Sequence, residues 1–195
     1  MGKIFYILGK SSTGKDTIYR EICDDKDLKL NPVILYTTRP IRDGEKNGIT
    51  YNFVNEEEYA KIKASGRIIE ERVYNTMHGL WRYFTAEDEN LRLDEASYIM
   101  IGVLSSYVSI RDYYGEDKVV PIYIEVDDGI RLERALKREQ KPENGKYAEM
   151  CRRFLADAED FSEDKIREAK IVKRFENIEL DRCISEVKGY IRERL

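Results

Sequence analysis

The feature that most constrains this chain is a glycine-rich segment near its N-terminus, Gly9-Lys-Ser-Ser-Thr-Gly-Lys-Asp16. A short apolar run at residues 3–8 precedes it and predicts a buried strand, while residues 17–23 place Ile18 and Ile22 on one face of a predicted helix. Glycines let such a loop curl, so that successive backbone N–H groups and the positive end of the helix face one point. The segment therefore predicts a phosphate-binding loop.

The spacing Gly-x-x-x-x-Gly-Lys is that of the Walker A motif, whose lysine reaches the β- and γ-phosphates of a nucleoside triphosphate. A glycine-rich turn with a solvated lysine is the alternative, and the strand before the loop and the helix after it disfavour that alternative. We predict that ATP binds the whole segment: Gly9, Lys10, Ser11, Ser12, Thr13, Gly14, Lys15, Asp16 and Thr17.

Asp16 departs from the motif, which has Ser or Thr at this position to contact Mg²⁺. A carboxylate is a good ligand for a hard cation, so we expect Asp16 to bind the metal, with Thr17 as a substitute. The structural alternative is that Asp16 is only an acidic residue favoured in the first turn of a helix.

The rest of the chain alternates predicted strands with predicted helices. Strands are expected at 33–37, 50–54, 68–74, 81–85, 98–103, 119–126 and near 170–172, and helices at 56–65, 87–96, 107–114, 129–140, 147–161 and 180–195. This alternation predicts an α/β fold of the P-loop NTPase type, with a parallel sheet flanked by helices. Between about 39 and 85, short β segments and glycine-bearing turns predict an inserted antiparallel subdomain.

Composition restricts the class of partner. The 195 residues suit a single domain, and 42% hydrophobic with 37% charged residues is typical of a soluble globular protein. A net charge of −4 provides no general attraction to nucleic acid or to an anionic membrane, so neither partner is expected. Cys23, Cys151 and Cys183 lack metal-ligand spacing and indicate reduced thiols. Because no apolar run approaches a membrane-spanning length, we expect a cytoplasmic protein.

Residues 37–54, Thr-Thr-Arg-Pro-Ile-Arg-Asp-Gly-Glu-Lys-Asn-Gly-Ile-Thr-Tyr-Asn-Phe-Val, resemble the guanylate kinase signature T-T-R-x-P-R-x-x-E-x-x-G-x-x-Y-x-F. Only the proline is out of register, by one place. The resemblance implies that Arg39, Arg42 and Tyr51 bind the phosphate of GMP, and guanidinium groups suit phosphate oxygens. Without the resemblance, the two arginines are equally well explained as surface charges.

The resemblance continues toward the base, with departures. Gly66-Arg-Ile-Ile-Glu70 resembles G-x-x-[IL]-E, which implies that Glu70 accepts hydrogen bonds from guanine. His78 stands where the family has a phosphate-binding tyrosine, and it either donates to the acceptor phosphate or is a loop histidine without a ligand. Residues 98–106 lack the family's aspartate, and Leu35 and Tyr36 replace serines near the base. The acceptor therefore stays open to another nucleotide.

Two later segments resemble the helical lid of the family. Residues 132–138 are similar to L-x-x-R-L-x-x-R, and residues 150–154 to I-x-x-R-L. The resemblance implies that Arg134, Arg138 and Arg153 neutralise the transferring phosphoryl group. The alternative is a solvated helix face paired with nearby glutamates. Residues 175–180 resemble the family's late V-x-N-x-x-L, so the resemblance runs nearly end to end.

Together these patterns identify a divergent member of the guanylate kinase family, a single domain over 1–195. We expect a core at about 1–35 and 96–195, an acceptor-binding insertion at about 36–88 and a lid at about 134–153. The implied activity is a Mg²⁺-dependent nucleoside monophosphate kinase that converts ATP and GMP to ADP and GDP. The implied catalytic residues are Lys15, Arg39, Arg134, Arg138 and Arg153.

Three other functions stay open. One is a kinase of the same fold with a different phosphorylated acceptor. Another is a guanylate-kinase-like module that binds protein; such modules commonly lose the phosphate-binding loop, which this chain keeps. The third is a nucleotide-binding regulator, which turnover would distinguish.

Overall fold

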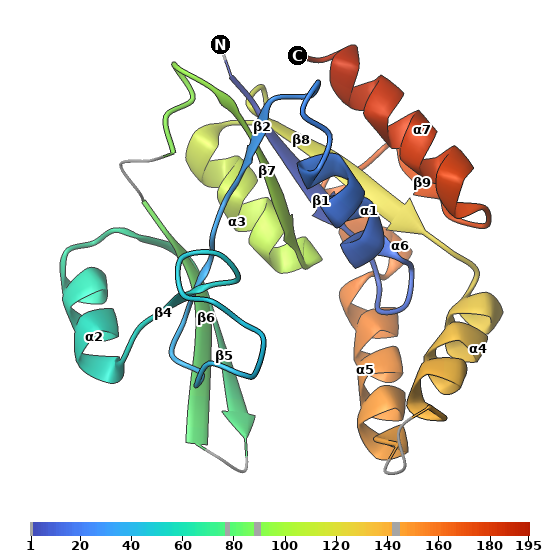
Figure 1. Cartoon of the computed structure of the whole chain (residues 1–195), viewed down its shortest axis with the longest axis horizontal. Coiled ribbons are helices and arrows are strands. Elements are labelled where there is room, and N and C mark those ends of the chain that lie inside the picture. Colours follow the sequence, from blue (N-terminus) through green and yellow to red (C-terminus); the bar gives the residue numbers. More distant parts are fainter. Residues whose placement is uncertain (1, 77–78, 88–90, 142–144) are drawn as a thin grey trace.

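A computed structural model of the chain describes residues 2–76, 79–87, 91–141 and 145–195. Its centre is a five-stranded parallel sheet in the order β2-β7-β1-β8-β9 (Figure 1). The strands are β1 (Ile4–Leu8), β2 (Leu30–Pro32), β7 (Ser97–Gly102), β8 (Val119–Glu125) and β9 (Arg174–Glu176). Every pairing in this sheet is parallel, which confirms the predicted fold class.

Both faces of this sheet are covered, because all five residues of β1 are buried. On one face, the alternate residues Ile4, Tyr6 and Leu8 pack with α3 (Leu104–Tyr114) and α6 (Glu163–Glu168). On the other face, Phe5 and Ile7 pack with α1 (Lys15–Cys23) and α7 (Leu180–Arg192). An apolar run without alternation is what such a two-sided environment requires.

A second, four-stranded sheet has the order β4-β3-β6-β5. Its strands are β3 (Tyr36–Thr37), β4 (Asn52–Phe53), β5 (Ile68–Thr76) and β6 (Gly79–Ala86). The predicted antiparallel insertion is confirmed for β3–β6 and β5–β6, whereas β3 and β4 pair in parallel. Helix α2 (Glu56–Ala64) begins with a capping box between Asn55 and Glu58, and its Tyr59 packs on Phe84 of β6.

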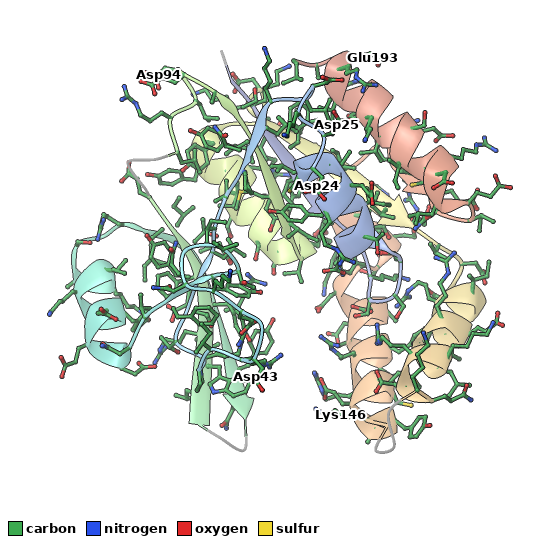
Figure 2. All side chains as sticks on the ribbon, in the orientation of Figure 1. Asp24, Asp25, Asp43, Asp94, Lys146 and Glu193 are labelled. Carbon is green, nitrogen blue, oxygen red and sulfur yellow. The ribbon has the colours of Figure 1, made fainter. Side chains whose placement is uncertain are left out.

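Two further helices, α4 (Asp128–Glu139) and α5 (Tyr147–Asp160), follow β8. In Figure 1 they extend from the parallel sheet in the same direction as the second sheet does. Figure 2 labels one residue in each of these two regions. Asp43, between β3 and β4, lies beside the second sheet, and Lys146 comes just before α5. Across the ranges that the structure describes, no helix is long and apolar enough to cross a membrane.

Three expected elements are wrong. Of the strand expected at 33–37, only Tyr36–Thr37 (β3) forms, because the chain leaves the parallel sheet after β2, which ends at Pro32, and then enters the second sheet. The last strand lies at Arg174–Glu176 instead of 170–172, since Lys170 has a left-handed backbone (φ 58°) and Val172 is 91% exposed. Residues 91–96, expected to be helical, form turns, and the carbonyl of Leu93 accepts the N–H of Gly2 at 2.7 Å.

Candidate functional site

The glycine-rich loop joins the end of β1 to the start of α1, as predicted. Gly9 (φ 155°) and Gly14 (φ 84°) have backbone conformations that favour glycine. A Cβ atom on Gly9 would lie 2.4 Å from the carbonyl oxygen of Ile124, and one on Gly14 would lie 2.4 Å from Nδ2 of Asn177. The two glycines are therefore required both by the curl of the loop and by the close approach of its neighbours.

Asn177, just after β9, holds the loop in this shape. Its Nδ2 donates to the backbone oxygen of Thr13 at 2.7 Å, and its own N–H donates to the carbonyl of Glu125 at 2.9 Å. Thr13 is itself buried and donates from Oγ1 to the carbonyl of Lys10 at 2.9 Å. The segment that follows β9 thus fixes a loop that lies more than 160 residues away in the sequence.

Lys15 and Asp16 begin α1. Lys15 Nζ lies 3.3 Å from Asp16 Oδ2, and the Asp16 side chain is 77% exposed. Within the described ranges, no three His, Cys, Asp or Glu side chains are grouped to hold a metal. Mg²⁺ is commonly held by one or two carboxylates together with substrate phosphates and water, so an exposed carboxylate beside the lysine fits such an ion. Thr17, half-buried, lies in the same helical turn.

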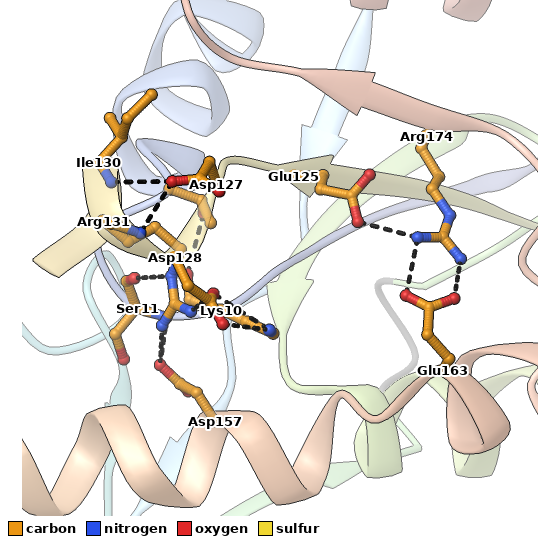
Figure 3. Close-up of polar contacts among 12 residues, drawn as sticks. Lys10, Ser11, Glu125, Asp127, Asp128, Ile130, Arg131, Asp157, Glu163 and Arg174 are labelled. Carbon is orange, nitrogen blue, oxygen red and sulfur yellow. Dashed lines mark hydrogen bonds and ion pairs between the residues drawn. The ribbon is translucent and has the colours of Figure 1, made fainter.

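A buried arginine in α4 links the glycine-rich loop to both α4 and α5 (Figure 3). Arg131 is 1% exposed, and its Nε donates to the carbonyl of Ser11 at 2.9 Å. Its other nitrogens bond Asp128 of α4 and Asp157 of α5, the latter at 2.9 Å. Asp157 also accepts the Ser11 N–H at 2.7 Å, and Lys10 pairs with Asp128 at 3.2 Å. The loop therefore contacts α4 and α5 through its backbone.

The three predicted lid arginines have different surroundings. Arg134 donates to the carbonyl of Asn177 at 3.0 Å, while Arg138 Nη1 lies 3.4 Å from Ser12 Oγ of the phosphate-binding loop. Arg153 lies 3.7 Å from the carboxylate of Glu149 and is largely exposed. Arg138 and Arg153 nevertheless line one pocket together with Ser11 and Ser12.

On the second sheet, Arg39 is buried and its guanidinium is already paired. Nη1 and Nη2 each donate to one oxygen of Glu45 at 2.7 Å, and Nε donates to the hydroxyl of Tyr83 at 3.1 Å. This bidentate hydrogen bond from Arg39 lowers the pKa of Glu45 from 4.5 to about 2. Arg39 therefore lies in the acceptor subdomain as a fixed cation whose donors are mostly occupied.

The other two predicted phosphate ligands lie close to Arg39. The Tyr51 ring is 5.3 Å from the Arg39 guanidinium carbon and 5.8 Å from the Tyr83 ring. Arg42 is exposed, with its guanidinium 5.9 Å from the Trp81 ring, and its N–H donates to Glu45 at 2.8 Å. The structure thus brings Arg39, Arg42 and Tyr51 together around Glu45 and Tyr83.

Glu70, the predicted base-recognition residue, is buried at the start of β5. Thr85 Oγ1 and Ser106 Oγ each donate to its carboxylate at 2.8 Å, and Arg72 Nε lies 3.3 Å from it. Ser106 comes from α3, so this carboxylate joins the second sheet to the parallel-sheet core. His78, the other predicted acceptor-side residue, lies outside the described residues.

The sequence patterns did not single out Arg72, Tyr83, Ser106, Arg131 or Asp157. Arg72 lies two residues from Glu70 on β5, whereas the other four come close to a predicted site residue through packing between separate elements. The burial of Arg131, unusual for a charged residue, is visible only in the structure and carried no local signal in the sequence. Asn177 lies within residues 175–180, which resemble V-x-N-x-x-L, but no role was predicted for it.

Sequence comparisons agree on one family. Residues 1–89 match the family model for guanylate kinase. Over 69 residues, the chain is 42% identical to guanylate kinase from Mesoplasma florum and 44% identical to that from Malacoplasma penetrans. These matches cover 35% of this chain in both cases, but only 23% and 35% of the two relatives, well under two thirds of their length.

Longer matches cover nearly the whole chain. Guanylate kinase from Porphyromonas gingivalis is 28% identical over 193 residues, which is 98% of this chain and 97% of that protein. The crystal structure of guanylate kinase from Anaplasma phagocytophilum has the same fold, with a TM-score of 0.67 at 18% identity over 98% of this chain and 85% of that one. In sequence and in fold, this chain is thus similar to guanylate kinases over nearly its whole length.

Proposed function

We propose that this protein is an ATP-dependent nucleoside monophosphate kinase, with GMP as the preferred acceptor and ADP and GDP as products. The core at about 1–35 and 96–195 binds ATP, the insertion at about 36–88 binds the acceptor, and a lid at about 134–153 closes over both. The similarity of the chain to guanylate kinases supports this proposal.

One observation carries the proposal. The phosphate-binding loop and two lid arginines border the same pocket, with Ser11 and Ser12 on one side and Arg138 and Arg153 on the other. Phosphoryl transfer needs little covalent chemistry from a protein, because positioning and charge neutralisation account for most of the rate. A loop rich in backbone N–H groups that shares a pocket with arginines is suited to that task.

On the donor side, the loop N–H groups and Lys15 hold the triphosphate. Asp16, with Thr17 as the alternative, would hold Mg²⁺, which supplies charge neutralisation on the phosphate oxygens when it is bound. Arg134 and Arg138 approach from α4 and Arg153 from α5, so that charge developing on the transferring group is met by three guanidinium groups. Closure of these helices would also exclude water.

On the acceptor side, Arg39, Arg42 and Tyr51 bind the phosphate that receives the γ-phosphoryl group. The charge of Arg39 is partly neutralised by Glu45. Arg42 is exposed, so its guanidinium is more available to the acceptor phosphate. Glu70 completes the acceptor site on the side of the base. His78 completes it on the side of the phosphate, where it reaches that group. The phosphate oxygen of the acceptor then attacks the γ-phosphorus in line, and ADP leaves.

The test is ATP consumption by the purified protein with Mg²⁺ across GMP, dGMP, AMP, CMP, UMP and dTMP. Lys15→Ala is expected to lower kcat by at least about 100-fold, because a cation on the transferring phosphate is lost. Lys26→Ala, an exposed lysine just beyond α1, is the matched control and is expected to leave turnover unchanged.

The outcomes separate the candidate functions. Turnover confined to GMP and dGMP supports the proposal, whereas turnover on another monophosphate keeps the reaction and replaces the acceptor. A folded protein that binds ATP but turns over none of the six acceptors contradicts the kinase assignment and favours a binding or regulatory role.

A further inference from the structure

The carboxylate of Glu70 is nearly saturated by donors of its own chain. Thr85, Ser106 and Arg72 together make three contacts with it, at 2.8, 2.8 and 3.3 Å, and its side chain is only 4% exposed. A carboxylate has about four lone-pair positions for hydrogen bonds. Little of this group is left to accept hydrogen bonds from the N–H edge of a base.

The space beside Glu70 is filled as well. Tyr6 of β1 is buried, and its hydroxyl lies where a Cβ atom on Gly102 would be, 2.1 Å away. The end of β7, Ile101 and Gly102, therefore meets a phenol and carries no carboxylate of its own. A pair of carboxylates, one of them at the end of β7, therefore cannot recognise a base beside Glu70.

Arg72 is the member of this cluster that reaches the surface. Its side chain is 19% exposed, and Nε is its only nitrogen with a hydrogen-bond partner in the part of the chain that the structure describes. Burial raises the pKa of Tyr6 and of Tyr51, and the positive charge of Arg72 opposes that rise in both. Arg72 therefore acts on the base-side cluster and also on the phosphate-side tyrosine, and neither of its Nη groups has a hydrogen-bond partner among the described residues.

We propose that Arg72, oriented by buried Glu70, contacts the nucleobase of the acceptor and selects bases with two adjacent acceptor atoms, as in O6 and N7 of guanine or hypoxanthine. This inference rests on the proposed function. A guanidinium fork matches that pair of atoms with two parallel hydrogen bonds. Adenine presents an amino donor at the same position and is rejected. Glu70 is then a positioning residue for Arg72.

Inosine monophosphate distinguishes this assignment from recognition by Glu70. Hypoxanthine keeps O6 and N7 but lacks the 2-amino group of guanine. If Arg72 recognises the base, IMP and GMP bind alike. If the Glu70 carboxylate accepts from N1–H and the 2-amino group, IMP loses one of the two hydrogen bonds and binds more weakly.

The experiment measures binding of GMP, IMP and AMP to the full chain by calorimetry, and turnover of each with Mg·ATP. For the wild type we expect Kd values for GMP and IMP within about threefold of each other, and a Kd for AMP at least about tenfold higher. Arg72→Lys keeps the charge but loses the fork, so the preference for GMP and IMP over AMP should fall about tenfold. Arg67→Lys, an exposed arginine just before β5, is the matched control and should change no ratio.

Three results would overturn the inference. An IMP affinity at least about tenfold below that of GMP would assign base recognition to Glu70. An equal loss for all three monophosphates in Arg72→Lys would place Arg72 on the phosphate. An unchanged preference in that variant would remove Arg72 from recognition. The GMP-to-IMP ratio of the wild type needs no variant, so a folding defect in Arg72→Lys does not decide the matter.

Failure of the proposed function is recognised separately. If none of the three monophosphates binds or is turned over, the kinase assignment and this inference fall together. If GMP is turned over but the base ratios contradict the expectation, only the inference falls.

Discussion

Arg131 and Asp157 form an ion pair that joins α4 to α5, with Nη2 of the buried arginine 2.9 Å from Oδ2 of the half-buried aspartate. Both residues also bond the backbone of Ser11, the arginine to its carbonyl and the aspartate to its N–H. The Arg131 guanidinium also lies 4.8 Å from the Phe154 ring. Such a pair is favourable when further hydrogen bonds satisfy its two groups, and Ser11 and Asp128 supply such bonds here. The pair thus fixes the loop against both helices.

Removing the aspartate should therefore be costly. We expect Asp157→Ala to lower the free energy of unfolding by about 3 kcal/mol, because a buried guanidinium loses a partner and the Ser11 N–H loses its acceptor. Asp164→Ala, an exposed aspartate on α6, is the control and should change it by less than about 0.5 kcal/mol. Urea unfolding at pH 7 measures both. Equal effects of the two substitutions would show that the pair contributes nothing specific.

Two glycines with nearly the same backbone differ in surroundings. Gly14 (φ 84°) has no room for a Cβ atom beside Asn177, whereas Gly44 (φ 82°) has nothing within 4 Å. Gly44→Ala should cost about 1–2 kcal/mol from the left-handed conformation alone. Gly14→Ala adds the collision, for a total of about 3 kcal/mol or more, and should also weaken ATP binding.

Denaturant unfolding with ATP titration of both variants checks this expectation. A comparable loss of stability in the two variants, with ATP binding unchanged in Gly14→Ala, would mean that the loop tolerates movement of Asn177.

The pair of Arg39 and Glu45 predicts a pH dependence of stability. Hydrogen bonding from Arg39 holds the pKa of Glu45 at about 2, below its ordinary 4.5. The folded state therefore binds fewer protons at Glu45 than the unfolded state between these values. The stabilisation is fully present above about pH 4.5 and is lost as the pH falls toward 2.

Glu45→Gln removes this contribution. The variant should be less stable than the wild type at pH 7, and the difference should shrink as the pH falls from 4.5 to 2.5. Glu57→Gln, an exposed residue on α2, should keep the wild-type profile. Unfolding curves at several pH values measure this, and a difference that is constant with pH would contradict the assignment.

Two arginines of the lid helices offer a matched comparison for the proposed reaction. Arg138 reaches Ser12 of the loop, while Arg152 is exposed and paired with Glu149 at 2.7 Å. We expect Arg138→Ala to lower kcat by about 100- to 1,000-fold with a smaller change in KM for ATP, because the charge acts mainly in the transition state. Arg152→Ala should change kcat by less than about threefold.

Steady-state kinetics with the accepted monophosphate checks this pair. Equal losses of kcat in both variants would show that general lid stability, and not contact with the loop, accounts for the effect.

The local signals in the sequence were sufficient to predict the glycine-rich loop between β1 and α1. Gly9, Gly14 and Lys15 lie within seven residues, and the shape of the loop depends on backbone conformation that glycine favours directly. The unbroken apolar run of β1 likewise predicted a strand buried on both faces, and the structure confirms it.

The secondary-structure predictions were wrong where the local signals in the sequence were weak. The segment 33–37 contains β-type residues, but the position at which the chain passes from one sheet to the other depends on pairing with Ile99 and Tyr83, which no local pattern contains. Residues 91–96 are of a composition compatible with a helix, yet their carbonyls and N–H groups bond Gly2 and Tyr98 instead.

The sequence by itself thus determined the parallel fold, the glycine-rich loop and the resemblance to guanylate kinases, because these depend on short-range spacing and backbone preference. Only the tertiary structure decided the surroundings of the marked residues: that Arg39 is paired with Glu45, that Glu70 accepts hydrogen bonds from Thr85 and Ser106 beside Arg72, and that Arg131 is buried. Such states depend on which side chains from distant elements share a low-dielectric space, and that arrangement exists only in the folded chain.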